Sequence, residues 1–360
     1  MRFRTCALMV LRAQIFGNLS PLAKRRLHNF RANRRAVWSW RLLLILIGFS
    51  MASDIVANDR PLLMRLDGVF YAPLLKDYSE QDLGGTFATT ADYRDPFVRD
   101  LIHQRGWAVW PMIGFRFDTI DLGLTAPAPV APSSRHWLGT DDRGRDVLAR
   151  LLYGLRLSLL FALLLTLGSV VVGVTAGLIQ GYVGGMADLL LQRFLEIWSG
   201  MPGLYLLMIL ASVISPSFWW LLGFLLLFSW MGLVGLVRAE TLRVRNFDYI
   251  RAAQVLGVST PVILWRHVLP NALVATLTFL PFMLSGAMTT LTSLDFLGLG
   301  LPVGTPSLGE MLSQGKANLQ APWLAAVGFV GTGSILLLLV FTGEAVRDAF
   351  DPRKLPGGGR

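Results

Sequence analysis

Long runs of apolar residues most limit how this chain can fold. Leu221–Phe228 and Ile335–Phe341 contain almost no polar side chain, so neither has the polar stripe of a helix on the surface of a soluble protein. A helix of about 20 apolar residues is long enough to cross a lipid bilayer. Only 16% of the 360 residues are charged, against about a quarter in soluble domains. The sequence therefore predicts an all-α integral membrane protein.

Six segments are long and apolar enough to be membrane-spanning helices. They are Trp40–Ala57, Leu157–Ile179, Leu189–Ile214, Phe218–Val237, Ala272–Leu294 and Trp323–Phe341. The third contains Gly200, Pro202 and Gly203, and a proline there is expected to kink or break the helix. Backbone groups freed inside a bilayer are tolerated where they face protein or a cavity. These three residues are therefore candidates for a kink on a translocation path.

Basic residues are concentrated at the N-terminus. Residues 1–53 contain ten Arg or Lys and no Asp or Glu, which alone equals the net charge of +10. Because Arg and Lys are enriched in cytoplasmic loops, the N-terminus is expected in the cytoplasm, and six spans return the C-terminus to the same side. Residues 238–267 hold five Arg against two acids, and residues 54–146 hold 14 acids against ten bases. They are expected inside and outside, respectively.

Small and charged residues predict further contacts. Gly173, Gly177 and Gly181 repeat every four residues, which places them on one face of the second span as a helix-packing surface. Arg193 and Glu196 are three residues apart and can pair on one helix face. The alternating charges of residues 141–146 are expected to form a local network of ion pairs just before the second span.

Residues typical of catalysis or metal binding are not apparent. The chain has one cysteine, Cys6, and four dispersed histidines, which argues against a metal site. Gly309–Lys316 is similar to a phosphate-binding loop, but it is one residue too long and lacks the Ser or Thr after the lysine. A nucleic-acid-binding face would interleave basic and aromatic residues on one folded surface, whereas the basic excess here lies in residues 1–53, just before an apolar run, so nucleic-acid binding is not expected. No catalytic residue, metal ligand or cofactor is expected in this chain.

The segment between the fourth and fifth spans has strong local signals. Tyr249–Leu256 predicts a short helix that Gly257 ends. Ser259 and Pro261 are typical of the start of a second helix, and Pro270 is expected to end the unit. Two short helices at a glycine corner, with small alanines on the surface, would make a rigid knob that can enter a groove of a partner.

This segment resembles the "EAA" loop of ABC-importer permeases, with Arg251 in place of the glutamate. His136–Val147, Ser293–Pro302 and Pro306–Gly309 are similar to stretches of oligopeptide and dipeptide permeases of that family. The resemblance implies the type I ABC-importer permease fold with an extended periplasmic segment between helices 1 and 2. It also implies that the loop docks on an ATP-binding subunit. The docking residues would be Tyr249, Ile250, Arg251, Ala252, Ala253, Leu256, Gly257, Leu269 and Pro270.

The resemblance also implies partners, and the spans and loop charges predict a domain organisation. The partners are a second permease subunit, two ATP-binding subunits that hold Mg-ATP, a periplasmic peptide-binding protein and the lipid of a bacterial inner membrane. The segments are 1–39 (basic, cytoplasmic), 40–57 (first span), 58–150 (periplasmic), 151–347 (core with five spans and the cytoplasmic loop 238–271) and 348–360 (cytoplasmic tail). The periplasmic segment is similar to that of the second permease subunit of microcin C-type peptide importers.

Two alternative functions stay open at this point. A gradient-driven transporter or channel without an ATPase would need charged groups in mid-span, and the second, fourth, fifth and sixth spans have none. A permease for nickel or another small solute is the other alternative, because nickel importers have similar permeases.

Overall fold

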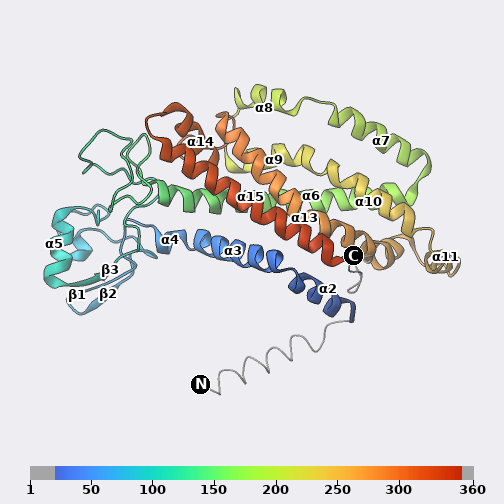
Figure 1. Ribbon diagram of the computed structural model, residues 1–360, viewed down its shortest axis with the longest axis horizontal. Helices are drawn as coiled ribbons and strands as arrows, with labels where there is room; N and C mark the ends of the chain where they lie inside the picture. The colour runs from blue at the N-terminus through green and yellow to red at the C-terminus, as the bar shows by residue number, and fades with distance from the viewer. Residues whose placement is uncertain (1–20, 351–360) are drawn as a thin grey trace, which may run out of the picture.

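The computed structural model describes residues 21–350, which form a helical bundle with a small β-sheet at one end (Figure 1). The chain begins with α2 (Pro21–Ala32), α3 (Arg34–Met51) and α4 (Ser53–Val56). The next segment holds β1 (Leu63–Leu66), β2 (Val69–Tyr71), the 3-10 turn η1 (Gln81–Leu83), α5 (Pro96–Arg105) and β3 (Gly106–Val109). The bundle holds α6 (Val147–Val183), α7 (Gly185–Ser199), α8 (Gly203–Ala211), α9 (Phe218–Ser229), α10 (Met231–Val244), α11 (Asp248–Val255), α12 (Thr260–Val262), the π-helical segment η2 (Ile263–Val268), α13 (Leu269–Phe296), α14 (Leu308–Ala317) and α15 (Pro322–Phe350). The first 20 residues and the end of the predicted tail, 351–360, lie outside the described residues.

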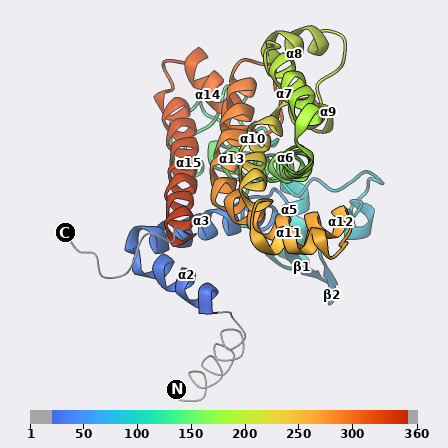
Figure 2. The same ribbon diagram turned by 90° about the vertical axis from the view of Figure 1, so that its right-hand side faces the viewer.

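The long helix α6 is the centre of the bundle. Asp146 caps its N-terminus by accepting a hydrogen bond from the Ala149 amide (2.8 Å), so the helix begins well before the predicted start at Leu157. It ends at Gly184, whose φ of +67° favours glycine. α6 packs against α10, α13 and α9, and Figure 2, which views α6 end-on, shows α10 and α13 beside it. The largest cluster of buried apolar side chains joins α6, α9, α13 and α15.

Four helical stretches within residues 21–350 are long and apolar enough to cross a membrane. They are α6, α9 with α10, α12 through α13, and α15. The pair α7 and α8 would be a fifth span if it crosses as one unit, with a bend of 60° at its break. α3 covers most of the first predicted span, but three of its 18 residues are arginines and it is not among the four. A mostly helical, multi-pass fold is confirmed, whereas a count of six spans is not.

The small sheet was not predicted from the sequence. Its strand order is β2-β1-β3, and both pairs are antiparallel. Alternation along β1 buries Met64 and Leu66 beside α5 and leaves Arg65 outside. Asp67 and Gly68, both with positive φ, turn the chain from β1 to β2, and this dipeptide is a typical hairpin signal. Strands of three or four residues are too short for their alternation alone to be distinguished from a loop.

The prediction that Pro270 ends the unit before the fifth span is wrong. The chain is helical without interruption from Thr260 to Phe296, and Pro270 lies in the first turn of α13, directly after η2. A proline lacks the backbone N–H and its ring crowds the preceding turn. In the π-helical turn of η2, hydrogen bonds join residues five positions apart instead of four. The wider turn accommodates the Pro270 ring and its missing N–H where η2 meets α13.

Candidate functional site: the Gly257 corner and an interhelical cavity

The segment from α11 to the start of α13, here called the Gly257 corner (residues 248–270), turns at Gly257, where local hydrogen bonds hold the turn. Gly257 has a φ of +74°, and its amide donates to the Gln254 carbonyl (3.0 Å). The Val258 amide donates back to the Ala253 carbonyl (3.0 Å). These bonds satisfy carbonyl groups at the helix end, and the left-handed conformation between them favours glycine. The structure therefore contains the expected corner at the expected residue.

One side of the corner is anchored in the bundle. Ile250, Ile263 and Val268 are buried in a cluster with side chains of α6 and α10, among them Leu178 and Val237. Ala253 belongs to the same cluster, which corrects the expectation that both alanines lie on the surface. Ala252 is exposed. Because α11 repeats every 3.6 residues, neighbouring alanines point to different sides, and only one of them faces out.

The other side of the corner exposes apolar side chains. Val255 is 89% exposed, Leu256 is 81% exposed and Trp265 is 71% exposed. Tyr249 is held on this surface by a hydrogen bond from the Asn271 amide nitrogen to its hydroxyl (3.2 Å). Of the other predicted docking residues, Arg251 and Pro270 are exposed and Leu269 is half-buried. We call the exposed side chains of Val255 and Leu256 the apolar tip. In Figure 1 α11, which ends at Val255, lies at the opposite end of the bundle from the sheet.

The predicted glycine face lies against α10. A Cβ atom built on Gly173 would come 2.7 Å from the Trp230 carbonyl oxygen. The same atom on Gly177 or Gly181 would come 2.7 Å from Val237 Cβ or Thr241 Cβ. Contacts this short require hydrogen in place of a side chain, so the backbones of α6 and α10 approach closely along three successive turns.

The predicted kink lies between α7 and α8. Gly200 follows the last residue of α7, and Pro202 precedes Gly203 at the start of α8. The Trp198 indole nitrogen donates to the Leu227 carbonyl (3.0 Å), which ties the end of α7 to α9. Arg193 and Glu196 form an exposed ion pair on α7.

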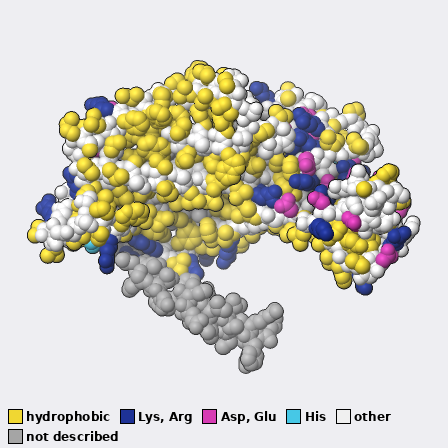
Figure 3. All heavy atoms as spheres, turned by 180° about the vertical axis from the view of Figure 1, so that it is seen from behind, with side chains coloured by type: hydrophobic (Ala, Val, Ile, Leu, Met, Phe, Trp, Pro, Cys, Tyr) yellow, Lys and Arg dark blue, Asp and Glu magenta, His cyan; other side chains and the backbone are white. Residues whose placement is uncertain are grey.

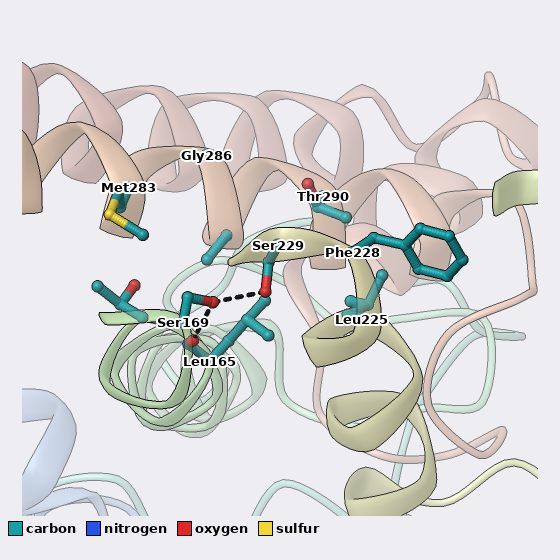
Figure 4. A pocket seen from close by; sticks show the side chains of 10 residues that line it. Leu165, Ser169, Leu225, Phe228, Ser229, Met283, Gly286 and Thr290 are labelled. Carbon is teal, nitrogen blue, oxygen red and sulfur yellow. Dashed lines mark hydrogen bonds between the residues drawn. The ribbon is translucent and has the colours of Figure 1, made fainter. Parts of the chain in front are cut away.

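A cavity of about 320 Å³ lies between α6, α9 and α13 (Figure 4). Its lining combines apolar groups with the hydroxyls of Thr166, Ser169, Ser229 and Thr290, and it contains no charged side chain. Figure 4 shows Ser169 and Ser229 pointing toward each other, and their hydroxyl oxygens are 2.5 Å apart. The buried Thr166 hydroxyl has no hydrogen-bond partner among the described residues. The residues of the α7–α8 break do not line this cavity.

The charges before α6 form a larger network than the sequence predicted. Arg145 pairs with Asp141 (2.6 Å), as expected, whereas Asp142 and Arg143 are exposed. The missed partners come from distant segments. Arg150 pairs with Glu310 of α14 (2.6 Å), and His136 lies between Asp146 (2.8 Å) and Asp121 (3.1 Å). Local spacing gave no signal for these contacts, because the paired residues are 10 to 160 positions apart.

His136 makes this network sensitive to pH. Burial lowers the pKa of His136, but the hydrogen bonds and charges of Asp146 and Asp121 outweigh burial and raise it above 6.5. The folded state therefore favours the protonated ring. The stability that protonated His136 contributes is fully present below the pKa of histidine in the unfolded state, about 6.5. It is lost as the pH rises through the raised pKa of the folded state.

We therefore expect the melting temperature of the detergent-purified protein to fall between pH 6 and pH 8.5, and to fall less for His136→Gln. Each kcal/mol lost should lower the melting temperature by roughly 2–4 °C. His103→Gln is the matched control, since His103 is exposed. Equal pH dependence of the wild type and His136→Gln would show that this histidine does not carry the effect.

Comparisons with known proteins agree with this architecture. Residues 173–356 match the family described as "Binding-protein-dependent transport system inner membrane component". The "Inner membrane ABC transporter permease protein YejE" of Escherichia coli is 59% identical over 338 residues, which cover 94% of this chain and 99% of the relative. The "Peptidoglycan transport system permease protein YejE" of Agrobacterium fabrum is 53% identical over 359 residues, which cover 93% and 94%.

A more distant relative is the "Oligopeptide transport system permease protein OppC" of Haemophilus influenzae. It is 33% identical over 240 residues, which cover 66% of this chain and 77% of the relative. The family match spans α10, the Gly257 corner and α13, so the corner and the buried residues that anchor it lie inside the matched region. The chain therefore belongs to the family of inner-membrane permease components of binding-protein-dependent transport systems.

Proposed function

We propose that this chain is a permease subunit of an ATP-driven importer for peptides, and that the Gly257 corner couples it to an ATP-binding subunit. The apolar tip carries the proposal: Val255 and Leu256 are almost fully exposed on a turn whose opposite side is packed into the bundle. An exposed apolar group on a rigid support is typical of a protein interface. The relatives of this chain that are named as ABC transporter and oligopeptide transport permeases support the same proposal.

The anchoring explains how movement would be transmitted. A docked ATP-binding subunit that moves the tip must also move Ile250 and Ile263, which pack against α6 and α10. Because packed interiors are stiff, the displacement passes into the bundle instead of being absorbed in the turn. Mg-ATP is bound and hydrolysed by the partner subunits, and this chain performs no covalent chemistry.

The proposed topology has six spans, with α3 as the first and the bent pair α7–α8 as the third. Both termini and the Gly257 corner lie in the cytoplasm, in keeping with the charge of residues 1–53 and 238–267. Residues 58–146 lie in the periplasm, where a peptide-binding protein delivers the substrate. A second permease subunit completes the translocation path across the bacterial inner membrane.

The cavity between α6, α9 and α13 and the break at Gly200–Gly203 are the proposed path elements in this subunit. Hydroxyl groups can bond to the backbone of a peptide whatever its side chains are, and the cavity has no charge that would select among them. We propose peptides as the substrate class, including microcin C-like ones. A gradient-driven carrier and a nickel permease are not favoured, because the relatives are named for peptide and peptidoglycan transport.

The test is co-purification of the ATP-binding subunit with tagged Leu256→Asp. Loss of a central apolar contact at an interface costs about 2 kcal/mol or more, so we expect at least a tenfold loss of bound ATPase and a parallel loss of peptide uptake. Leu122→Asp is the matched control, since Leu122 is 90% exposed in the segment that we place in the periplasm.

Both variants should remain folded, because neither side chain is buried. Full ATPase binding by the double variant, which carries both Leu256→Asp and Val255→Asp, would contradict coupling through the apolar tip. Uptake that persists in wild-type vesicles without any ATP-binding subunit would contradict the ATP-driven class itself.

A further inference from the structure

The outer face of the small sheet carries exposed apolar and aromatic side chains. In the strand register Arg65 lies opposite both Phe70 and Trp107, and Leu63 lies opposite Val109. Directly opposed residues point to the same side of a sheet, so these five residues share one surface. Phe70 is 59% exposed and Trp107 is 47% exposed. We call this surface, formed by Leu63, Arg65, Phe70, Trp107 and Val109, the outer sheet face.

The outer sheet face is ordered by contacts among its own side chains. The rings of Phe70 and Trp107 meet edge to face, with centroids 6.4 Å apart. The guanidinium of Arg65 lies 5.3 Å from the centroid of Phe70. The inner side of the same sheet is filled by Met64, Leu66 and α5. The outer sheet face is therefore an ordered aromatic surface with the Arg65 guanidinium at its centre, and the core of the domain lies on the other side of the sheet.

The chain connection keeps this face close to the membrane. Only six residues separate the end of α4 at Val56 from Leu63, the first residue of β1, so the two lie within about 25 Å of each other. The bridge between Ala57 and Ile113 and the burial of both beside Tyr153 tie this end of the domain to α6. In Figure 1 α5 lies on the far side of the sheet from the bundle, which leaves the outer face on the side of the spans.

The composition of the face matches the polar boundary of a bilayer. Tryptophan is enriched at the membrane interface, and arginine there reaches anionic headgroups while its stem covers apolar surface. Figure 3 shows the apolar surface of the bundle and an apolar area on the small domain with charged side chains between them. Along the molecule, the apolar surface of the bundle is followed by charged side chains and then by the apolar area of the small domain. This order suits a domain that folds back onto the lipid headgroups beside α3.

We propose that the outer sheet face rests on the headgroup layer of the outer leaflet and binds lipid, so that the small domain is held at a constant position relative to the spans. The partner is a lipid surface that contains anionic headgroups. The proposal rests on the periplasmic placement of residues 58–146 made above, and it does not depend on peptides as the substrate or on ATP as the energy source.

The experiment places a probe on the face in the full-length chain. Cys6 is the single cysteine, so Cys6→Ser with Phe70→Cys allows one environment-sensitive fluorophore to be attached. The protein is reconstituted with its partner permease into vesicles of phosphatidylethanolamine and phosphatidylglycerol that contain a headgroup-labelled nitroxide lipid. Phe87→Cys is the matched control, because Phe87 is 64% exposed on the same domain and lies in the chain between Leu83 and Ala91, which pack with Met64 and Leu66 on the inner side of the sheet. Val109→Cys is a second probe position on the face.

We expect the nitroxide lipid to quench the probe at position 70 at least twofold more than the probe at position 87, with less quenching by aqueous iodide. Equal quenching at positions 70 and 87, with position 109 also unaffected, would overturn the proposal. Shielding of position 70 only when a purified peptide-binding protein is added would also overturn it, in favour of a protein partner. Periplasmic placement is checked separately by labelling position 87 in intact spheroplasts with a membrane-impermeant reagent.

Discussion

Replacing Gly177 with alanine should destabilise the protein, whereas the same replacement at Gly223 should not. The added Cβ on Gly177 would lie 2.7 Å from Val237 Cβ and 2.9 Å from the Val234 carbonyl oxygen. A backbone atom cannot rotate away, so α6 and α10 must separate, and overpacking of this kind costs about 1–3 kcal/mol. At Gly223 no atom lies within 4 Å, and alanine is favoured over glycine in a helix by up to about 1 kcal/mol.

The two variants are therefore expected to change stability in opposite directions. Thermal unfolding of the detergent-purified protein measures this, and Gly177→Leu, which adds a larger side chain, should abolish the folded yield. A wild-type melting temperature for Gly177→Ala would show that the close approach of α6 and α10 is not needed for stability.

Replacing Arg150 with methionine should also cause a large loss of stability. Arg150 is fully buried, pairs with Glu310 (2.6 Å) and donates to the Phe117 carbonyl (3.2 Å). It thus joins α6 to α14 and to the segment before α6. Methionine preserves much of the volume but removes the nearer of the two cations beside Glu310, since Arg145 lies 3.5 Å from the same carboxylate. Removing one partner of a buried ion pair costs about 3–5 kcal/mol.

The contribution of the pair itself can be measured by a double-mutant cycle. Arg150→Met with Glu310→Gln should be more stable than Arg150→Met alone, because the carboxylate that has lost its nearer cation is removed. Arg193→Met is the control: its pair with Glu196 is exposed, and such pairs contribute about 0–1 kcal/mol. Equal effects of Arg150→Met and Arg193→Met on the melting temperature would contradict the role assigned to the buried network.

Local signals predicted the Gly257 corner well. Three local signals lie within a few residues of one another: a run of residues that favour a helix, a glycine that can adopt the left-handed conformation, and residues typical of the start of the next helix. The turn therefore depends on short-range contacts that the sequence shows directly. Pro270 was misjudged because its tolerance depends on the π-helical turn before it, and the geometry of that turn depends on how Ile263 and Val268 pack into the bundle. The inward position of Ala253 has the same cause.

The long-range contacts could not be read from spacing. The partner of Arg150 is 160 residues away, and the carboxylates around His136 come from both sides of it in the chain. The cavity between α6, α9 and α13 and the outer sheet face are likewise formed by residues from separate segments. In each case the position of the elements decides which side chains meet.

The sequence by itself determined the class of this protein. Apolar runs require a membrane, charge asymmetry indicates an orientation, and the glycine repeat and glycine corner are local patterns whose chemistry does not depend on distant residues. Only the tertiary structure decided which faces those elements bury. It placed the glycine repeat against α10, anchored one side of the corner and exposed the other, and brought His136 and Arg150 to carboxylates of remote segments. Pairing and burial depend on how helices pack in three dimensions, and the spacing of residues along one chain does not contain that information.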